Sequence, residues 1–259
     1  MFLALSFFAL NSYISQQKQG PASSNILTSE KPMEKADATT TDIKITPISH
    51  ASFVMHMGGQ VIYNDPVGGE KAYSGQDKPT MILLSDIHQD HFDIPTLKSL
   101  STKDVTMVVP QAVADELPPD VVSNLIIMKN GESQIEKGIE IEAIPMYNIP
   151  ESSSAFHTKG RGNGYVLSNS GKRVYIAGDT GPIPEMLRLK NIDIAFIPMN
   201  LPYTMSVEDA ASAVAEFKPK VVHPYHYKGL NGFSDINNFK KLVESKDPSI
   251  KVDLLNFYP

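Results

Sequence analysis

The sequence predicts an α/β domain in which two β-sheets pack face to face and helices cover their outer surfaces. Two observations predict this fold class. Many short segments with strand character come first, and strands then alternate with amphipathic helices toward the C-terminus. The chain has 259 residues, of which 41% are hydrophobic and 20% charged, so one domain with a large core is the simplest organisation.

Each element follows from a local pattern. The run 81–84 is apolar throughout, which is typical of a short strand buried on both faces. Strands are expected over residues 43–48, 53–57, 61–63, 81–84, 105–109, 125–128, 139–144, 164–168, 172–177, 192–198, 221–223 and 252–255. Helices are expected over 94–100, 183–189, 207–217 and 236–244, with Ser206 and Ser234 as N-caps of the last two.

The first 41 residues differ from the rest. Residues 2–10 form an apolar run that is too short to span a bilayer, which takes about 20 residues, and it fits the hydrophobic part of a secretory signal. Residues 15–41 are polar, without a helical or strand period, and predict a linker before a domain over 42–259. We therefore expect export if the segment is a signal, and a cytoplasmic protein if it is not. A truncated lipid anchor and an unreliable start codon are the alternatives.

Charge and cysteine content exclude several classes of function. The net charge is −6 and no basic stripe runs along the chain, so nucleic acid is not an expected partner. No cysteine is present, which excludes disulfides and thiolate-zinc sites. Any metal must therefore be held by imidazole and oxygen ligands.

The densest group of potential ligands follows the apolar run 81–84. Asp86, His88, Asp90 and His91 place four such side chains within six positions. Crowded carboxylates and imidazoles repel or compete for protons unless a cation holds them, and this mixture suits zinc, manganese or iron. The alternative is a solvated polar turn that happens to be rich in Asp and His.

Two further segments place ligand types at strand ends. Gly178 and Asp179 follow the strand expected over 172–177, where the carboxylate could bridge two cations. His223 and His226 come at the end of the strand over 221–223, and either could reach a shared site. Taken alone, Asp179 could also be a turn or helix-cap residue, and either histidine an ordinary core or surface residue.

Taken together, these three segments resemble the metallo-β-lactamase superfamily, from residue 43 to the C-terminus. That family carries an HxHxDH loop after a buried strand, then a His, a Gly-Asp and a final His, in a four-layer αββα sandwich. Here the loop reads DIHQDH, so Asp86 stands at the first His position. Asn148 stands at the place of the next ligand. The segments 50–53, 64–66 and 162–165 resemble the branch that includes L-ascorbate-6-phosphate lactonase-like proteins and the N-acyl-phosphatidylethanolamine phospholipase D group.

The resemblance implies one or two divalent cations. One cation site would keep all of the family's ligands, and Asp179 would be shared between the two sites. If His226 is not the last ligand of the family pattern, His223 would take its place. The other would be richer in oxygen and weaker, favouring manganese or iron over zinc. The implied ligands are Asp90, His91 and His226 for the complete site and Asp86, His88 and Asn148 for the weaker one.

The mechanism implied is hydrolysis by a metal-activated water, oriented by Asp90. His50 is a candidate to hydrogen-bond a ligand or the leaving group, although a structural strand histidine is the alternative. The substrate is expected to be a small molecule, and His157 and Lys159 could bind an anionic group on it. Candidate substrate-binding residues are His157, Lys159, Asn163 and Tyr203. The first three belong to a Gly-rich stretch, which could instead be a mobile loop without a binding role.

The leading hypothesis is a metal-dependent hydrolase that cleaves a lactone or a phosphodiester-type bond. The alternative is a metal-binding protein of the same fold with little or no catalysis, because Asp86 and Asn148 change one cation site. A true β-lactamase is a weaker reading, because the ligand loop departs from HxHxDH.

Overall fold

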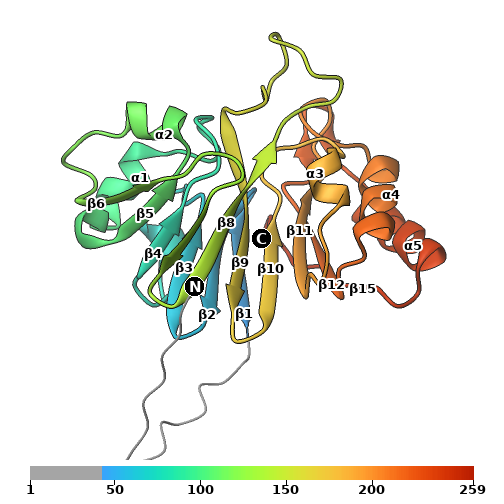
Figure 1. The fold of residues 1–259 in the computed structure, drawn as a ribbon, viewed down its shortest axis with the longest axis horizontal. Coiled ribbons are helices and arrows are strands. Elements are labelled where there is room, and N and C mark those ends of the chain that lie inside the picture. The colour runs from blue at the N-terminus through green and yellow to red at the C-terminus, as the bar shows by residue number, and fades with distance from the viewer. Residues whose placement is uncertain (1–42) are drawn as a thin grey trace, which may run out of the picture. The chain divides into compact units, whose positions relative to one another are not determined.

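The computed structural model describes residues 43–259 (Figure 1). The signal-like segment and linker predicted over residues 1–41 lie outside the described residues. Two sheets lie against each other, with α1 and α2 beside one sheet and α3, α4 and α5 beside the other (Figure 1). This arrangement confirms the predicted α/β fold class. Within the described part of the chain, no helix is both long and apolar enough to cross a membrane.

The first sheet has six strands in sequence order. The pairs β1–β2 and β2–β3 are antiparallel, and the remaining neighbours are parallel. Its strands are β1 (Lys44–Ser49), β2 (Ser52–Met57), β3 (Gln60–Asn64), β4 (Met81–Leu83), β5 (Thr106–Val109) and β6 (Asn124–Ile127). The parallel half therefore places the carboxyl ends of β3, β4, β5 and β6 at one edge.

The second sheet has seven strands in the order β15-β12-β11-β10-β9-β8-β7. The neighbours from β10 to β15 are parallel, and those from β7 to β10 are antiparallel. Its strands are β7 (Ser133–Glu136), β8 (Ile139–Met146), β9 (Gly162–Asn169), β10 (Lys172–Ile176), β11 (Ile194–Pro198), β12 (Val221–Tyr225) and β15 (Lys251–Val252). A short hairpin, β13 (Lys228–Gly229) and β14 (Gly232–Phe233), follows β12.

The helices largely follow the predictions. They are α1 (Ile94–Ser99), α2 (Gln111–Glu116), α3 (Pro184–Leu187), α4 (Val207–Phe217) and α5 (Ile236–Lys246). Ser206 caps α4 as predicted, accepting a hydrogen bond from the Asp209 amide. Ser234 was the wrong cap for α5, because Asp235 accepts the first free amides of that helix and the Ser234 hydroxyl donates to the Met199 carbonyl.

Helix α2 and strand β7 were not predicted, and both lack a clear hydrophobic period; the two-residue strands β13 and β14 were not predicted either. Helix α2 buries only Val113, so its six residues carry no amphipathic pattern. Strand β7 lies at the edge of the second sheet, with all but one of its four side chains exposed. Such elements are formed by pairing and packing with their neighbours rather than by their own sequence pattern.

Alternate residues of the first sheet pack into two separate cores. Phe53 and Met55 of β2 face the second sheet, whereas Val54 between them faces the side of α1 and α2. Successive side chains of a strand point to opposite faces, so strands covered on both sides are apolar throughout. This explains the continuous apolar run that forms β4.

Candidate metal centre

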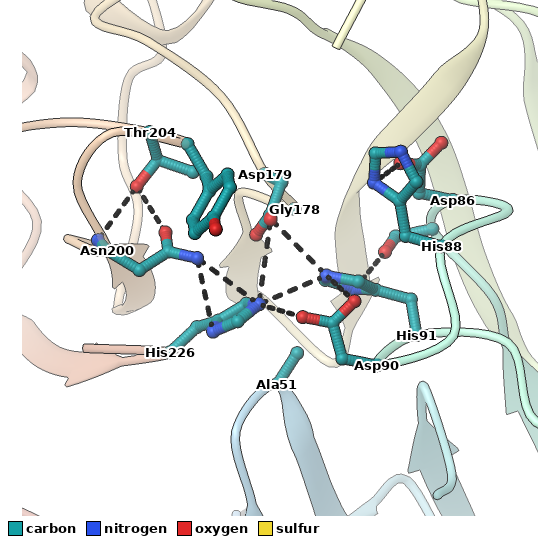
Figure 2. Close-up of polar contacts among 12 residues, drawn as sticks. Ala51, Asp86, His88, Asp90, His91, Gly178, Asp179, Asn200, Thr204 and His226 are labelled. Carbon is teal, nitrogen blue, oxygen red and sulfur yellow. Dashed lines mark hydrogen bonds and ion pairs between the residues drawn. The ribbon is translucent and has the colours of Figure 1, made fainter. Parts of the chain in front are cut away.

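The predicted ligands converge at one edge of the sandwich, where loops follow β3, β4, β8, β10 and β12. In Figure 2 the side chains of Asp90, His91, Asp179 and His226 point toward one another, with Asp86 and His88 to one side. Ligands in open α/β sheets bind outside the carboxyl ends of the strands, so this position fits the topology.

Asp65, which follows β3, holds the ligand loop in place. Its carboxylate accepts hydrogen bonds from the Ser85 amide at 2.7 Å and from the Ser85 hydroxyl at 2.6 Å. The same carboxylate lies 2.9 Å from Nδ1 of His91. A histidine that donates its Nδ1 proton to a carboxylate presents Nε2 as a metal ligand. Asp65 therefore fixes the orientation of His91, a role that was not predicted.

Asp90, His91 and His226, here called the His226 cluster, have donor atoms close to one another. Nε2 of His226 lies 3.2 Å from Nε2 of His91 and 3.2 Å from Oδ2 of Asp90. Ligand atoms about 2.0–2.2 Å from a tetrahedral cation lie about 3.3–3.6 Å apart. Most of the observed spacings are close to that value, although Nε2 of His91 and Oδ1 of Asp90 are 4.0 Å apart.

Asp179 connects this cluster to a second one. Its Oδ2 lies 3.4 Å from Nε2 of His91, 3.5 Å from Nε2 of His226 and 3.4 Å from Nε2 of His157. Gly178 before it has φ of 66°, and a Cβ there would lie 2.5 Å from the sulfur of Met146. Only glycine fits this turn, and the turn places the Asp179 carboxylate between both clusters.

Asp86, His88 and His157, here called the His157 cluster, form the second group. Oδ2 of Asp86 lies 2.9 Å from Nδ1 of His88 and 3.7 Å from Nε2 of His157. Both oxygens of Asp86 also accept hydrogen bonds from Arg161, at 2.9 and 2.8 Å. The carboxylate is fully buried, and this two-fold guanidinium contact neutralises it within the protein.

The structure places His157, not Asn148, beside Asp86 and His88. Both ends of the Asn148 amide are used elsewhere: Nδ2 donates to the Tyr203 carbonyl at 2.8 Å, and Oδ1 accepts from the His157 amide at 2.9 Å. The side-chain oxygen of Asn148 is thus already hydrogen-bonded within the protein, and the structure gives no support to its prediction as a ligand. Asn148 instead holds the loop that presents His157.

The charges of the centre influence one another strongly. Burial alone would raise the pKa of Asp179, but the imidazoles of His226 and His91 hold it well below its usual range. Burial would lower the pKa of His91, yet the carboxylates of Asp179 and Asp65 raise it well above its ordinary value. Burial would also raise the pKa of Asp90, which hydrogen bonding to His226 and the nearby His91 hold below its usual range. The centre therefore strongly favours positive charge.

The donor set fits a divalent cation. Nε2 of His157 and Oδ1 of Asp179 are buried and have no hydrogen-bond partner among the described residues. Buried polar atoms without partners are costly unless they bind an ion or water. A set of ligands that combines imidazoles and carboxylates suits zinc, manganese or iron.

The remaining predicted residues lie in different places. His50 lies beside His226 but is not among the residues that line the cavity at the centre, which is described below. Its ring is 5.8 Å from that of His226, and its carbonyl accepts a hydrogen bond from the His226 amide at 3.1 Å. Lys159 forms ion pairs with Glu151 at 3.1 Å and with Glu185 at 3.7 Å. Asn163 is buried and bonds to neighbouring loops, donating to the Met128 carbonyl.

The other two histidines lie outside both clusters. Nδ1 of His223 is 2.9 Å from the Asp253 carbonyl oxygen, and Nε2 of His56 is 3.8 Å from the Asp77 carboxylate. His226 is thus the histidine of the β12 end that reaches the centre, and His223, the fallback ligand, does not.

A cavity of about 300 Å³ opens onto the centre. Tyr203 lines it, as predicted for a pocket residue, and so does Asn200, which was not predicted. Nδ2 of Asn200 lies 3.4 Å from Nδ1 of His226. The lining consists of His88, Asp90, Phe156, His157, Asp179, Asn200 and Tyr203.

Comparisons with known proteins agree with this geometry. A family model described as the β-lactamase superfamily domain matches residues 44–226. A solved structure of a proposed metal-dependent hydrolase from Parabacteroides distasonis is 36% identical, with a TM-score of 0.72, covering 82% of this chain and 92% of its own. The metallo hydrolase Igni18 from the archaeon Ignicoccus hospitalis is 25% identical, with a TM-score of 0.70, covering 83% of this chain and 95% of its own.

A relative in sequence points to a narrower family. The UPF0173 metal-dependent hydrolase of Pyrobaculum islandicum is 32% identical over 218 residues, which are 78% of this chain and 92% of that protein. Fold, ligand loop and relatives agree, and the chain therefore belongs to the metallo-β-lactamase superfamily and, within it, to the UPF0173 family of metal-dependent hydrolases.

Proposed function

We propose that this protein hydrolyses a lactone or a phosphodiester-type bond with a metal-activated water. The observation that carries the proposal is the convergence of donor atoms from Asp90, His91, Asp179 and His226 at spacings that suit a common cation. The finer resemblance to L-ascorbate-6-phosphate lactonase-like proteins remains a prediction that points in the same direction.

The His226 cluster would hold one cation and the His157 cluster a second, with Asp179 shared. We propose zinc in the former and zinc, manganese or iron in the latter, with His157 as the ligand in place of Asn148. A divalent cation at such a centre lowers the pKa of water toward neutrality and polarises the bond to be cleaved.

The chain's own residues position the reactants. Asp90 faces the cavity with a half-exposed carboxylate and would orient the water and accept its proton. Asn200 lines the same cavity, where its amide can donate to a substrate oxygen. His50 acts as a positioning residue, because its carbonyl holds the main chain of His226, whose φ of 45° lies in the left-handed region.

The test combines metal content with hydrolysis. The purified protein should contain one or two divalent cations per chain and should hydrolyse γ-valerolactone or bis-p-nitrophenyl phosphate. His91→Ala should lose at least one cation and reduce kcat/KM at least about 10²-fold while remaining folded by circular dichroism. His56→Ala is the matched control, because this histidine lies outside the centre. Unchanged turnover in His91→Ala would exclude the mechanism.

One observation favours a second candidate function. Arg161 already neutralises Asp86, so a second cation would compete with a guanidinium for that carboxylate. A centre with a single cation could bind metal with little or no catalysis. Protein loaded to one cation per chain that hydrolyses neither substrate would favour this metal-binding function over the hydrolase.

A further inference from the structure

Exposed apolar side chains gather around the cavity of the metal centre. Among the described residues, seven large hydrophobic side chains are exposed, and five of them belong to three loops that border the centre: Ile149, Phe156, Leu201, Leu230 and Phe233. The other two, Ile127 and Ile135, lie on β6 and β7, the edge strands of the two sheets. The apolar surface is therefore concentrated where the substrate must enter.

Contacts bring the three loops together, and their five exposed apolar side chains are here called the apolar rim. Phe156 lines the cavity, and its ring packs edge-on against that of Tyr203 at 5.0 Å. Leu201, two residues before Tyr203, accepts the Leu230 amide through its carbonyl at 3.0 Å. The rim thus runs from the mouth of the cavity to the β13–β14 hairpin.

Aromatic rings connect the rim to the His226 cluster. The Phe233 ring lies 5.0 Å from Tyr258, which lies 4.9 Å from the His50 ring. His50 in turn packs against His226. A chain of aromatic contacts therefore leads from the rim to His226.

Charge around the cavity disfavours a phosphate. Neither lysine nor arginine is among the seven described residues that line it. Of the basic side chains nearby, Lys159 is paired with Glu151 and Glu185, and Arg161 with Asp86. Lys228 does not line the cavity, and its Nζ lies over the Phe233 ring, 5.7 Å from the centroid. Phosphate sites usually provide arginine or lysine donors, whereas a neutral carbonyl compound needs none beyond the cation.

We infer that the substrate is a neutral lactone or ester that carries a bulky apolar group, and that the apolar rim binds this group. The inference rests on the proposed hydrolase function and narrows its substrate class. The reaction adds one water: the bond between the acyl carbon and the ester oxygen breaks, and the water oxygen bonds to the acyl carbon. One water proton ends on the leaving oxygen, so that a lactone yields a hydroxy acid.

The test is a series of γ-lactones that differ only in their alkyl group: γ-valerolactone, γ-octalactone and γ-decalactone. The alkyl group lies away from the carbonyl, so it changes binding more than reactivity. A fully buried methylene increases kcat/KM by about fourfold, and a half-buried one by about twofold. We therefore expect at least about a tenfold increase from the methyl to the hexyl compound.

Variants assign the effect to the rim. Phe156→Ala and Leu201→Ala should each remove a large part of the increase with alkyl length. Ile135→Ala is the matched control, since Ile135 is even more exposed than Phe156 and Leu201 but lies on an edge strand away from the centre. Binding of Nile red, a neutral apolar dye, to the metal-loaded protein gives a readout without turnover. Its affinity should fall in the two rim variants and stay unchanged in the control.

The outcomes separate the two proposals. If bis-p-nitrophenyl phosphate is hydrolysed while the lactones show no increase with alkyl length, the inference is wrong and the hydrolase function stands. If the metal-loaded protein hydrolyses none of these substrates, the proposed function fails, and with it the substrate class inferred here. If Ile135→Ala reduces the increase as much as Phe156→Ala does, the rim is not the binding surface.

Discussion

The two clusters of the metal centre differ in how their carboxylates are neutralised. In the His226 cluster, Asp90 faces the cavity with a half-exposed side chain and contacts His226. In the His157 cluster, Asp86 is fully buried and both of its oxygens bond to Arg161. A carboxylate with a permanent cationic partner gains less from a metal ion than one without. The difference predicts that a single arginine makes the His157 cluster the weaker of the two candidate cation sites.

The largest effect is expected for Asp179, which both clusters share. Asp179→Asn keeps the shape of the side chain and removes the charge that lies within 3.5 Å of His91, His226 and His157. We expect loss of at least one cation per chain and a fall in kcat/KM of more than about 10²-fold. Mass spectrometry of bound metal and lactone hydrolysis measure both. Asp193→Asn is the control, a buried aspartate paired with Lys220 instead. A variant that keeps the wild-type metal content would show that Asp179 does not bridge the clusters.

The next effect addresses Arg161 directly. Arg161→Ala leaves the buried charge of Asp86 uncompensated, so the metal-free protein should lose about 3 kcal/mol of its free energy of unfolding. Zinc or manganese should restore this stability, because the cation takes the place of the guanidinium. Affinity for the second cation should rise about tenfold relative to the wild type. Urea unfolding with and without metal, together with calorimetric titration, measures these changes.

Arg173→Ala is the matched control for this experiment, since Arg173 lies outside the centre, where it pairs with Glu142 and donates to the Lys190 carbonyl. Weaker binding of the second cation in Arg161→Ala would contradict the difference between the clusters. It would mean that the guanidinium helps to build the site rather than competing with the metal.

The sequence predicted those parts of the centre that depend on strand ends. His88, Asp90 and His91 follow a buried strand, and Asp179 and His226 each follow a parallel strand of the other sheet. Parallel strands bring their carboxyl ends to one edge, so a correct strand pattern already brings these side chains together. Most of the strands and helices were predicted for the same reason, because their hydrophobic period is local.

The parts that were missed depend on long-range contacts or on loop conformation. Arg161 and Asp86 are 75 residues apart in the sequence, and no local pattern predicts their contact. His157 lies in the long loop between β8 and β9, where no period fixes which side chain turns inward. The family resemblance put Asn148 at the place of this ligand, whereas the loop folds back and brings His157 to the centre.

A smaller effect is expected from Asp65, which orients His91. Asp65→Asn retains hydrogen-bonding groups but removes the negative charge beside Nδ1 of His91. Carboxylate partners of metal-binding histidines are worth about 10–100-fold in metal affinity or activity. The loss of metal affinity should affect the cation of the His226 cluster and leave metal binding by the His157 cluster unchanged. Asp77→Asn, an exposed aspartate beside His56, is the control. Equal loss of both cations would mean that Asp65 supports the whole edge of the fold.

The smallest effect separates His223 from its neighbour His226 on the same strand end. Burial lowers the pKa of His223, and the nearby Lys251 lowers it further, while its bond to the Asp253 carbonyl and the Asp253 charge oppose this. The folded protein therefore takes up this proton less readily than the unfolded chain, whose histidine titrates near 6.5. The free energy of unfolding should fall as the pH drops below that value, by at most about 1.4 kcal/mol per pH unit. His223→Gln should remove this part of the acid sensitivity in urea unfolding between pH 7 and pH 5.

Because His223 lies outside both clusters, the difference between wild type and variant should be the same with and without a chelator. A chelator-dependent difference would place His223 in contact with the metal after all.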